Sequence, residues 1–360
     1  MDDGVDRRHL PNKSSRVVGF TMVLLLASTV PACGEGNTSL APPEEVGDAV
    51  RWEETLELEE TADALIGIPQ LRVDPRGGWL FWDGLIDEAR VYARDGSLEQ
   101  VVGSRGEGPG EYSRVRALLR LEDGRLVTVD GSGRVGVWDS TGRTLLNHLE
   151  SGLPRVVGAV AMGGSQVFVY TAPRLLDSSG RLAPGAHLLD VDKEESGVSG
   201  LSLEVDPSFV TAVSQVEPPT PRKWRDSVYV ALAVMDSIWA LDSELRASRG
   251  APRALSSGRI AANEPPVTVA EGPDAFRSWV DRSTFLGDFV RLPDGRWLGN
   301  TWSFQEDEFV GGLFLTDEDG RLVWELPSQL QVLEVDLEGR VYFLDRDGMA
   351  PNQILVGRLR

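Results

Sequence analysis

The sequence predicts an all-β fold of short antiparallel strands organised in repeated units. Segments in which apolar and polar residues alternate recur along the chain, Asp-Gly turns separate them, and the turn glycines are regularly spaced. The clearest unit, at residues 119–142, reads LRLEDGRLVTVDGSGRVGVWDSTG. Its segments 126–129 and 135–138 alternate with a period of two residues, which is typical of half-buried strands.

Copies of this pattern follow one another through the chain. They lie at residues 71–96, at 119–142, at 163–171 with the following HLLDVD, at 226–233 with the following SIWALD, at 289–320 and at 332–345. The turn glycines Gly77 and Gly124 are 47 residues apart, and Gly295 and Gly339 are 44 apart. The 171 residues from Gly124 to Gly295 correspond to four steps of about 43 residues. A period in the forties with several short strands per unit is typical of a β-propeller, and six units predict six blades.

The two ends of the repeated region predict how the ring closes. The last unit supplies three strands, at 331–336, 340–345 and 353–359, whereas a propeller blade has four. The strand-like segment 51–60 precedes the first unit and has no partner there. We expect it to supply the outer strand of the last blade, which removes an exposed sheet edge. The predicted fold is therefore an all-β, six-bladed β-propeller whose N-terminal strand closes the last blade.

Composition argues against several classes of function. The chain has 360 residues and a formal net charge of −20, and 41% of its residues are hydrophobic, which indicates a folded protein. The negative charge argues against nucleic-acid binding, because phosphate contacts need a basic surface. One cysteine excludes a disulfide framework within the chain, and three histidines argue against a His-rich metal site.

The N-terminus predicts export and a lipid anchor. Basic residues precede the apolar segment 17–30, which is shorter than the roughly 20 residues that a membrane-spanning helix needs. This arrangement is typical of a secretory signal. The following Val30-Pro31-Ala32-Cys33 resembles the lipobox of bacterial lipoproteins, which implies that Cys33, the sole cysteine, is lipidated.

These features predict three segments. We expect a signal peptide at residues 1–32, a flexible tether at 33–49 and the propeller at 50–360. The expected location is the bacterial cell envelope, with the lipid-anchored domain facing the periplasm or the exterior. Two alternatives stay open: an ordinary signal with a chance cysteine, and twin-arginine export, since residues 6–10 (DRRHL) resemble that signal.

The second unit resembles a known repeat. Residues 101–142 are similar to an NHL repeat in their glycine-rich loop, with Gly103, Gly106, Gly108, Gly110 and Tyr112, and in the Arg134-Val135 that opens the third strand. Together with the lipidated signal, the loop resembles those of six-bladed propeller lipoproteins of environmental bacteria. This resemblance implies the fold and an exposed location, but little about activity, since propellers host many functions.

Polar residues are expected where the second strand of a blade meets the channel mouth. Counting six residues on from each turn glycine reaches Asp83, Asp130, Thr301 (with Asn300 before it) and Asp345. Three carboxylates and an amide around one opening could bind Ca²⁺, which takes about 6–8 oxygen ligands. Gluconolactonase-like propellers are similar in holding one axial metal with acidic and amide side chains. The alternative is that each aspartate caps its own turn.

The glycine-rich loop at 103–112 is a second candidate site. It joins the outer strand of one blade to the inner strand of the next, so it should lie on the ligand-binding face. Its side chains Arg105, Glu107, Glu111 and Tyr112 could line a pocket. The alternative is a structural crossover with Tyr112 wedged between two blades.

The long insertion at 250–285 is a third candidate. Connections of this length in compact domains are usually functional or disordered. Phe276, Trp279 and Phe285 could give it an apolar underside as a lid, and Trp279 and Trp224 are candidate ligand contacts. The alternative is a surface decoration that packs only on its neighbours.

Three functions remain open at this point. The leading hypothesis is non-catalytic binding of a protein, peptide or glycan at the channel mouth, since no Gly-x-Ser-x-Gly or comparable nucleophile motif occurs. The second is a metal-dependent hydrolase or lyase that uses Asp83, Asp130, Asn300 and Asp345. The third is a purely structural envelope component. The sequence identifies no catalytic residue and no cofactor other than the possible Ca²⁺.

Overall fold

The computed structural model describes residues 46–59, 69–83, 86–172, 185–193, 196–197, 216, 218–234, 238–242, 245, 247–248, 273–305, 308–346 and 352–360. The chain divides into two compact units, Met1–Ser39 and Leu40–Arg360, and all described residues belong to the second. The predicted signal peptide and Cys33 therefore lie outside the described residues.

The described residues form six four-stranded antiparallel sheets, numbered here as blades in chain order. Blade 1 contains β2 (Pro69–Val73), β3 (Trp79–Asp83), β4 (Glu88–Tyr92) and β5 (Leu98–Val101). Blade 2 contains β8 (Val115–Arg120), β9 (Leu126–Asp130), β10 (Arg134–Trp138) and β11 (Leu145–Glu150). Blade 3 contains β12 (Val156–Gly163), β13 (Gln166–Thr171), β14 (Ala186–Asp190) and β15 (Ser196–Gly197).

The second half of the chain forms the other three blades. Blade 4 contains β16 (Arg222–Trp224), β17 (Ser227–Ala231), β18 (Ile238–Leu241) and β19 (Ala247–Ser248). Blade 5 contains β20 (Thr284–Arg291), β21 (Trp297–Gln305), β22 (Glu308–Thr316) and β23 (Leu322–Pro327). Blade 6 contains β24 (Leu330–Val335), β25 (Val341–Asp345), β26 (Gln353–Leu359) and β1 (Val50–Glu57).

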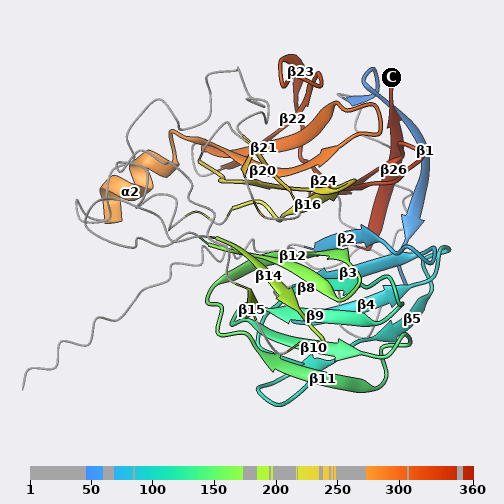
Figure 1. Cartoon of the computed structure of the whole chain (residues 1–360). Coiled ribbons are helices and arrows are strands. Elements are labelled where there is room, and N and C mark those ends of the chain that lie inside the picture. The colour runs from blue at the N-terminus through green and yellow to red at the C-terminus, as the bar shows by residue number, and fades with distance from the viewer. Residues whose placement is uncertain are drawn as a thin grey trace, which may run out of the picture. The chain divides into compact units, whose positions relative to one another are not determined.

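The blades follow one another around a ring (Figure 1). The inner strand β24 contacts both β20 and β2, β8 contacts β3 and β12, and β16 contacts β12 and β20. The predicted six-bladed propeller is therefore confirmed. In Figure 1, α2 (Pro273–Val280), which precedes β20, lies far from β1. No helix among the described residues is long and apolar enough to span a bilayer.

The ring closes as the sequence predicts. β1 pairs antiparallel with β26 in a register that runs from Val50 opposite Leu359 to Glu57 opposite Gln353. The backbone N–H of Arg360 also donates to the carbonyl of Ala49 over 3.0 Å. The N-terminal strand thus supplies the outer strand of the last blade and leaves no exposed edge on β26.

Short turns join the first strand of a blade to the second. In blade 2 the turn places Gly124 at φ +91°, where a side chain would be strained, and its N–H donates to the carbonyl of Leu121 over 2.9 Å. The carboxylate of Asp123 accepts the N–H of Arg125 at 3.0 Å. Asp294 accepts the N–H of Arg296 at the same distance in blade 5. The Asp-Gly pattern is therefore a self-sufficient local turn.

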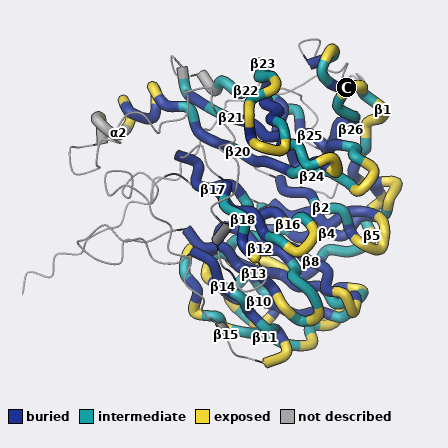
Figure 2. The backbone as a smooth tube through the Cα atoms, turned by 45° about the horizontal axis from the view of Figure 1, so that its top comes forward, coloured by how far each residue is buried: buried dark blue, intermediate teal, exposed yellow. Residues whose placement is uncertain are grey.

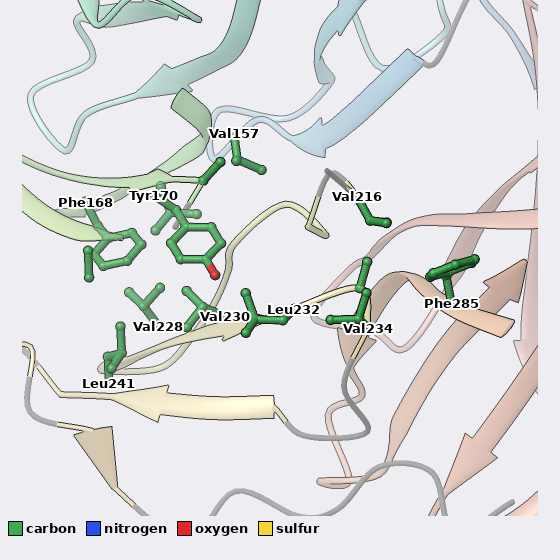
Figure 3. Packing of buried hydrophobic residues seen from close by; sticks show 14 of the residues in the cluster. Val157, Phe168, Tyr170, Val216, Val228, Val230, Leu232, Val234, Leu241 and Phe285 are labelled. Carbon is green, nitrogen blue, oxygen red and sulfur yellow. The ribbon is translucent and has the colours of Figure 1, made fainter. Parts of the chain in front are cut away.

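Apolar side chains fill the spaces between neighbouring blades. Figure 2 shows that the strands near the centre are largely buried, while exposed residues gather at turns and outer strands. Aromatic rings join the blades edge to face: Trp297 of blade 5 lies 4.8 Å from Tyr229 of blade 4. A larger cluster joins blades 3, 4 and 5 through Tyr170, Val230 and Phe285 (Figure 3).

A buried ion pair fastens blade 1 to blade 2. Arg120 of β8 donates from Nε and Nη2 to the carboxylate of Asp74 at 2.6–2.8 Å, and the two side chains are 5% and 2% exposed. Arg120 also donates to the carbonyls of Gly124 and Ser140. Arg120 thus has hydrogen-bond acceptors for its charged group beyond Asp74, and a buried ion pair needs such additional hydrogen bonds to offset its lost hydration.

Candidate functional site

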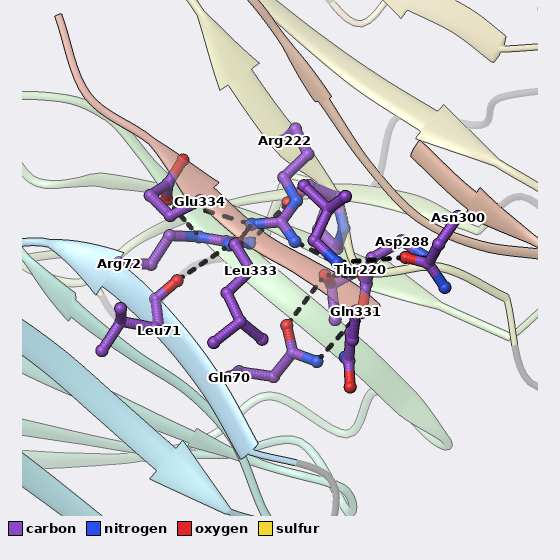
Figure 4. A network of polar contacts seen from close by, with 12 residues as sticks. Gln70, Leu71, Arg72, Thr220, Arg222, Asp288, Asn300, Gln331, Leu333 and Glu334 are labelled. Atoms are coloured by element: carbon purple, nitrogen blue, oxygen red, sulfur yellow. Dashed lines mark hydrogen bonds and ion pairs between the residues drawn. The ribbon is translucent and has the colours of Figure 1, made fainter. Parts of the chain in front are cut away.

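The polar side chains of four inner strands meet in the channel of the propeller (Figure 4). Gln70 and Arg72 come from β2, Arg222 from β16, Asp288 from β20, and Gln331 and Glu334 from β24. Three of these strands, β2, β20 and β24, are otherwise largely apolar, as in the TFLGDFVR of β20. Burying a polar side chain is unfavourable unless hydrogen-bond partners meet it. The polar residues of these strands find such partners in the channel.

One layer of this network is centred on Asp288, which is 7% exposed. Its carboxylate accepts from Gln331 Nε2 at 2.8 Å, from Thr220 Oγ1 at 3.1 Å, and from Gln70 Nε2 and Arg222 Nη2 at 3.4 Å each. These donors belong to blades 6, 4 and 1, with Thr220 just before β16. One carboxylate therefore joins its own blade to three others.

A second layer is built around Glu334. Its Oε2 lies 3.5 Å from Arg72 Nε and 3.9 Å from Arg222 Nη1, and its side chain is 16% exposed. Arg222 Nη1 also donates to the carbonyl of Leu333 at 2.8 Å, and Arg72 Nη2 donates to the carbonyl of Pro221 at 3.1 Å. Arg72 thus reaches from blade 1 across the channel to the segment that enters blade 4.

The buried position of Glu334 changes its acidity. Burial raises the pKa of this carboxyl to about 7, although the nearby charge of Arg222 opposes that rise. Asp336 and Asp288 add like charge that raises the pKa of Glu334 further. A pKa raised in this way is typical of a carboxyl that is removed from water among other charged groups.

Two of the predicted channel-mouth residues are used in packing: Asn300 at the seam between blades 5 and 6, and Thr301 within blade 5. Asn300 Oδ1 accepts the N–H of Asp288 at 3.2 Å and that of Val332 at 3.3 Å. Thr301 packs against Gly312, where an added Cβ would lie 2.6 Å from its hydroxyl. Both side chains are 6% exposed, so the structure uses them in packing rather than presenting them to solvent.

The three predicted aspartates do not form one cluster. Asp130 Oδ1 accepts the hydroxyl and N–H of Ser132 at 2.7 and 2.8 Å, and its other oxygen pairs with Arg134 Nη2 at 2.7 Å. Asp83 ends β3 and is fully buried, while Asp345 ends β25 and is half-buried. Among the residues that the structure describes, no three His, Cys, Asp or Glu residues lie close enough to hold a metal ion. The geometry of Asp130 is that of a residue capping its own turn.

The glycine-rich loop contains a short parallel pair, β6 (Ser104–Arg105) and β7 (Glu111–Tyr112). Tyr112 is 2% exposed; its hydroxyl donates to the carbonyl of Val102 at 2.9 Å and accepts the N–H of Ala89 at 3.1 Å. Burial raises the pKa of this hydroxyl. Tyr112 is therefore a packing residue between blades 1 and 2, as the structural alternative for this loop expects.

The charged residues of the loop divide between internal and exposed roles. Glu111 accepts the N–H of Gly108 at 2.7 Å and so stabilises the loop itself. Glu107, 85% exposed, pairs with Arg134 Nη1 at 3.2 Å, which links the loop to the Asp130 turn. Arg105, 76% exposed, lies 3.4 Å from Asp87. Arg105 and Glu107 are the loop residues that solvent, and hence a ligand, reaches.

Asp87 is a residue of this region that the repeat pattern does not reveal. It lies in the turn before β4 at φ +55°, a strained conformation for a residue with a side chain, and it is 6% exposed. Burial raises the pKa of its carboxyl, and the charges of Arg105, Arg114 and Arg116 oppose that rise. The arginines that face Asp87 are far from it in the sequence, so no local pattern reveals this residue.

An open groove of about 710 Å³ runs beside the same loop, between the outer strands of blades 1 and 2. It is lined by Gln100, Val101, Gly103, Ser104, Pro109, Gly110, Glu111, Trp138, Gly142, Arg143 and Leu145. Gly103 and Gly110 lie so close to the Trp138 ring that an added Cβ would contact it at 3.2 and 2.8 Å. The loop therefore covers Trp138, and only its edge faces the groove.

Trp279, one of the predicted ligand contacts, is buried in the structure. Trp279 lies in α2, is 1% exposed and packs edge to face against Phe285 at 5.4 Å. Both rings belong to the buried cluster that joins blades 3, 4 and 5. In the amphipathic helix α2, Trp279 lies on the buried face. The proline-rich and charged sequence around it instead suggests a loop. Most of the predicted lid, 250–272, and the side chain of Phe276 lie outside the described residues.

Solved structures share this fold. No protein-family model and no curated protein matches the sequence. A member of the DUF4221 family from Bacteroides vulgatus ATCC 8482 aligns with a TM-score of 0.61 at 9% identity, over 87% of this chain and 98% of that one. A "putative exported protein" from Bacteroides fragilis NCTC 9343 aligns with a TM-score of 0.58 at 11% identity, over 87% and 96%. The WD40 repeats of RRP9 align at 0.50 with 12% identity, over 86% and 100%, so the likeness is one of fold.

Proposed function

We propose that this protein is a lipid-anchored, extracytoplasmic β-propeller that binds a peptide, protein or glycan without catalysis. The observation that carries the proposal is the difference between the two ends of the ring. One end has short Asp-Gly turns such as 121–125 and 292–296. The other end has the long connections, including 102–114 and the 249–283 segment that contains α2. Long connections on a rigid scaffold are where binding residues usually lie.

The channel supports a site on the face rather than inside the ring. Asp288 accepts four side-chain hydrogen bonds, and Arg72 spans the channel to Pro221. These side chains already use the width of the channel for contacts with one another (Figure 4). A ligand would therefore meet the exposed residues of the face, which include Arg105 and Glu107.

The engagement of the carboxylates favours binding over metal-dependent catalysis. Asp130 is committed to Ser132 and Arg134, and Asn300 to two backbone N–H groups. A general acid or a metal ligand needs an oxygen that reaches substrate or metal. No contact of these residues favours the hydrolase or lyase alternative over binding.

The location is proposed from the N-terminus. Cys33 in its lipobox-like context and the preceding apolar segment support export and lipidation. The glycine-rich loop and the Arg134-Val135 strand support an NHL-type repeat. Intact mass spectrometry of membrane-extracted protein tests the anchor: a diacylglyceryl mass on Cys33 is expected, and a Cys33→Ala variant is expected to leave the membrane fraction. Unmodified Cys33 in the membrane-bound mature protein would contradict the anchor.

The binding proposal is tested by probing arrays of envelope glycans and envelope-protein peptides with residues 34–360. Arg105→Glu changes the face with long connections. Arg296→Glu changes a matched arginine at the end with short turns, where it pairs with Asp294 at 2.8 Å. We expect a bound probe whose affinity falls at least tenfold in Arg105→Glu and is unchanged in Arg296→Glu. Equal losses in the two variants, or no bound probe, would contradict the proposal.

A further inference from the structure

Four turns of the propeller share the pattern Asp-x-x-Gly-Arg and the same backbone hydrogen bond. They begin at Asp130, Asp139, Asp317 and Asp336. In each turn the N–H of the arginine donates to Oδ1 of the aspartate over 2.8–3.0 Å. Since this bond is common to all four turns, the direction of the arginine side chain is what distinguishes one turn from another.

The side chain of Arg143 takes a different direction from two of its counterparts. Arg134 and Arg340 fold back, and their Nε atoms donate to the aspartate of their own turn at 2.9 and 2.7 Å. Arg143 instead donates from Nε to Gln100 Oε1 of blade 1 at 3.1 Å, and Arg143 is an exposed residue. Among the described residues, no carboxylate forms an ion pair with Arg143. Gln100 therefore orients the guanidinium and leaves its two Nη groups available to a ligand.

This guanidinium lines the groove of about 710 Å³ beside the glycine-rich loop. Of the described residues that line the groove, Arg143 alone is cationic and Glu111 alone is anionic. Glu111 already accepts the N–H of Gly108 at 2.7 Å. One guanidinium matches one carboxylate through two parallel hydrogen bonds. A doubly charged phosphate would bring more negative charge toward Glu111, so the groove favours a carboxylate.

The rest of the lining favours a sugar over a peptide. The hydroxyl of the exposed Ser104 and the side-chain amide of Gln100 are suitable partners for sugar hydroxyl groups. Three glycines also line the groove, Gly103, Gly110 and Gly142. Without side chains at these positions, the groove lacks the row of separate pockets with which a strand-like peptide is recognised. Its volume lies in the range of sites for small ligands, about 300–1,000 Å³.

We propose that this groove binds an oligosaccharide of uronic acids, in which Arg143 pairs with a carboxylate while Ser104 and Gln100 bind hydroxyl groups. The inference rests on the proposed binding function and names the ligand class. Because the chain carries a net charge of −20, long-range attraction cannot supply affinity for an anion. Binding should therefore depend on this one guanidinium.

Calorimetric titration of the full chain with oligomers of galacturonate, glucuronate, mannuronate and guluronate tests the proposal. We expect at least one oligomer to bind and its uncharged methyl ester to bind about tenfold more weakly or worse. Arg143→Ala should cause a loss of similar size, and Arg143→Lys, which keeps the charge but not the planar fork, a smaller one. Arg321→Ala, at the matched position in the turn between β22 and β23, should leave the affinity unchanged. Since Arg143 is exposed, neither of its variants should alter the fold.

Three results would overturn the groove as a site for acidic glycans. One is that no uronate oligomer binds, and another is that Arg143→Ala and Arg321→Ala lose affinity equally. The third is that a hexaglutamate peptide binds more tightly than every uronate, which would assign the groove to acidic peptides. A ligand from the arrays that depends on Arg105 but not on Arg143 would overturn this inference alone and leave the proposed function standing.

Discussion

Blades 2 and 4 are built from the same four-strand pattern but are fastened in different ways. In blade 2 the inner strand β8 pairs with β9 from Val115 to Arg120, and the Asp74–Arg120 pair fixes its seam to blade 1. In blade 4 the inner strand β16 spans only Arg222–Trp224, and the channel network holds it to blades 1, 5 and 6. The inner strand of blade 2 is thus held by long strand pairing and one ion pair to its neighbour, whereas that of blade 4 has short pairing and depends on side-chain contacts with three other blades.

The largest expected effect comes from breaking the buried ion pair that fastens blade 2 to blade 1. Arg120→Ala leaves Asp74 buried without its cation and should destabilise the protein by about 3–5 kcal/mol, measured by denaturant unfolding. Arg125→Ala removes an ion pair whose carboxylate partner Asp192 has a 50% exposed side chain and should cost no more than about 1 kcal/mol. Equal losses would contradict the special role of the buried pair.

Breaking the channel network should have the next largest effect. Asp288→Ala leaves Gln331, Thr220 and Arg222 without their shared acceptor, and a buried donor left unpaired costs about 1–3 kcal/mol. We expect a total loss of about 3 kcal/mol, with blade 4 the most affected. Asp294→Ala, in an exposed turn, is the control and should cost less than about 1 kcal/mol. A loss for Asp288→Ala no greater than that of the control would refute the network's importance.

The stability of the protein should also depend on pH through Glu334 in the channel network. The pKa of Glu334 is raised to about 7 in the folded protein, so its contribution to stability is full below pH 4.5 and is lost as pH rises through 7. Between pH 5 and pH 8 the wild type should lose on the order of 2 kcal/mol relative to Glu334→Gln. Parallel curves of unfolding free energy against pH would show that Glu334 titrates normally.

A smaller effect is expected where blade 1 meets blade 2. Tyr112→Phe keeps the ring but removes the hydroxyl that joins Val102 to Ala89, which should cost about 1–2 kcal/mol. Thermal unfolding reports the loss, and any ligand found on the arrays should still bind. A loss of binding at unchanged stability would move Tyr112 from packing to recognition.

Calcium should have the smallest effect. Asp130 is saturated by Ser132 and Arg134, and the described residues hold no cluster of three metal-ligating side chains. The midpoint of thermal unfolding of residues 34–360 should therefore be the same in calcium and in chelator. A clear rise in calcium that disappears in Asp130→Ala would instead restore the metal-dependent alternative.

The fold was predictable because its signals are local. Alternating segments, Asp-Gly turns and their spacing specify a blade within some forty residues, and the unpaired strand at 51–60 reveals the ring closure. Counting from turn glycines also placed Asp83, Asp130 and Asp345 correctly at strand ends.

The candidate site was less predictable because its contacts are long-range. Counting from the turn glycines identifies residues at the ends of the second strands of the blades. The polar network of the channel instead comes from the first strands, where Gln70, Asp288 and Gln331 interrupt apolar segments. Such an interruption is a usable signal, because a polar residue in a buried strand needs a partner. Which residues from other blades supply that partner depends on the closed ring, and no local pattern contains this information.

The measurement that tests this account most directly is native-state hydrogen exchange of the wild type and Asp288→Ala, compared blade by blade. If the channel network holds blade 4, exchange should rise selectively in residues 222–241 and stay unchanged in residues 115–138 of blade 2. A uniform rise in all blades, or protection of blade 4 that survives the substitution, would show that strand pairing and packing hold blade 4 and would contradict the account.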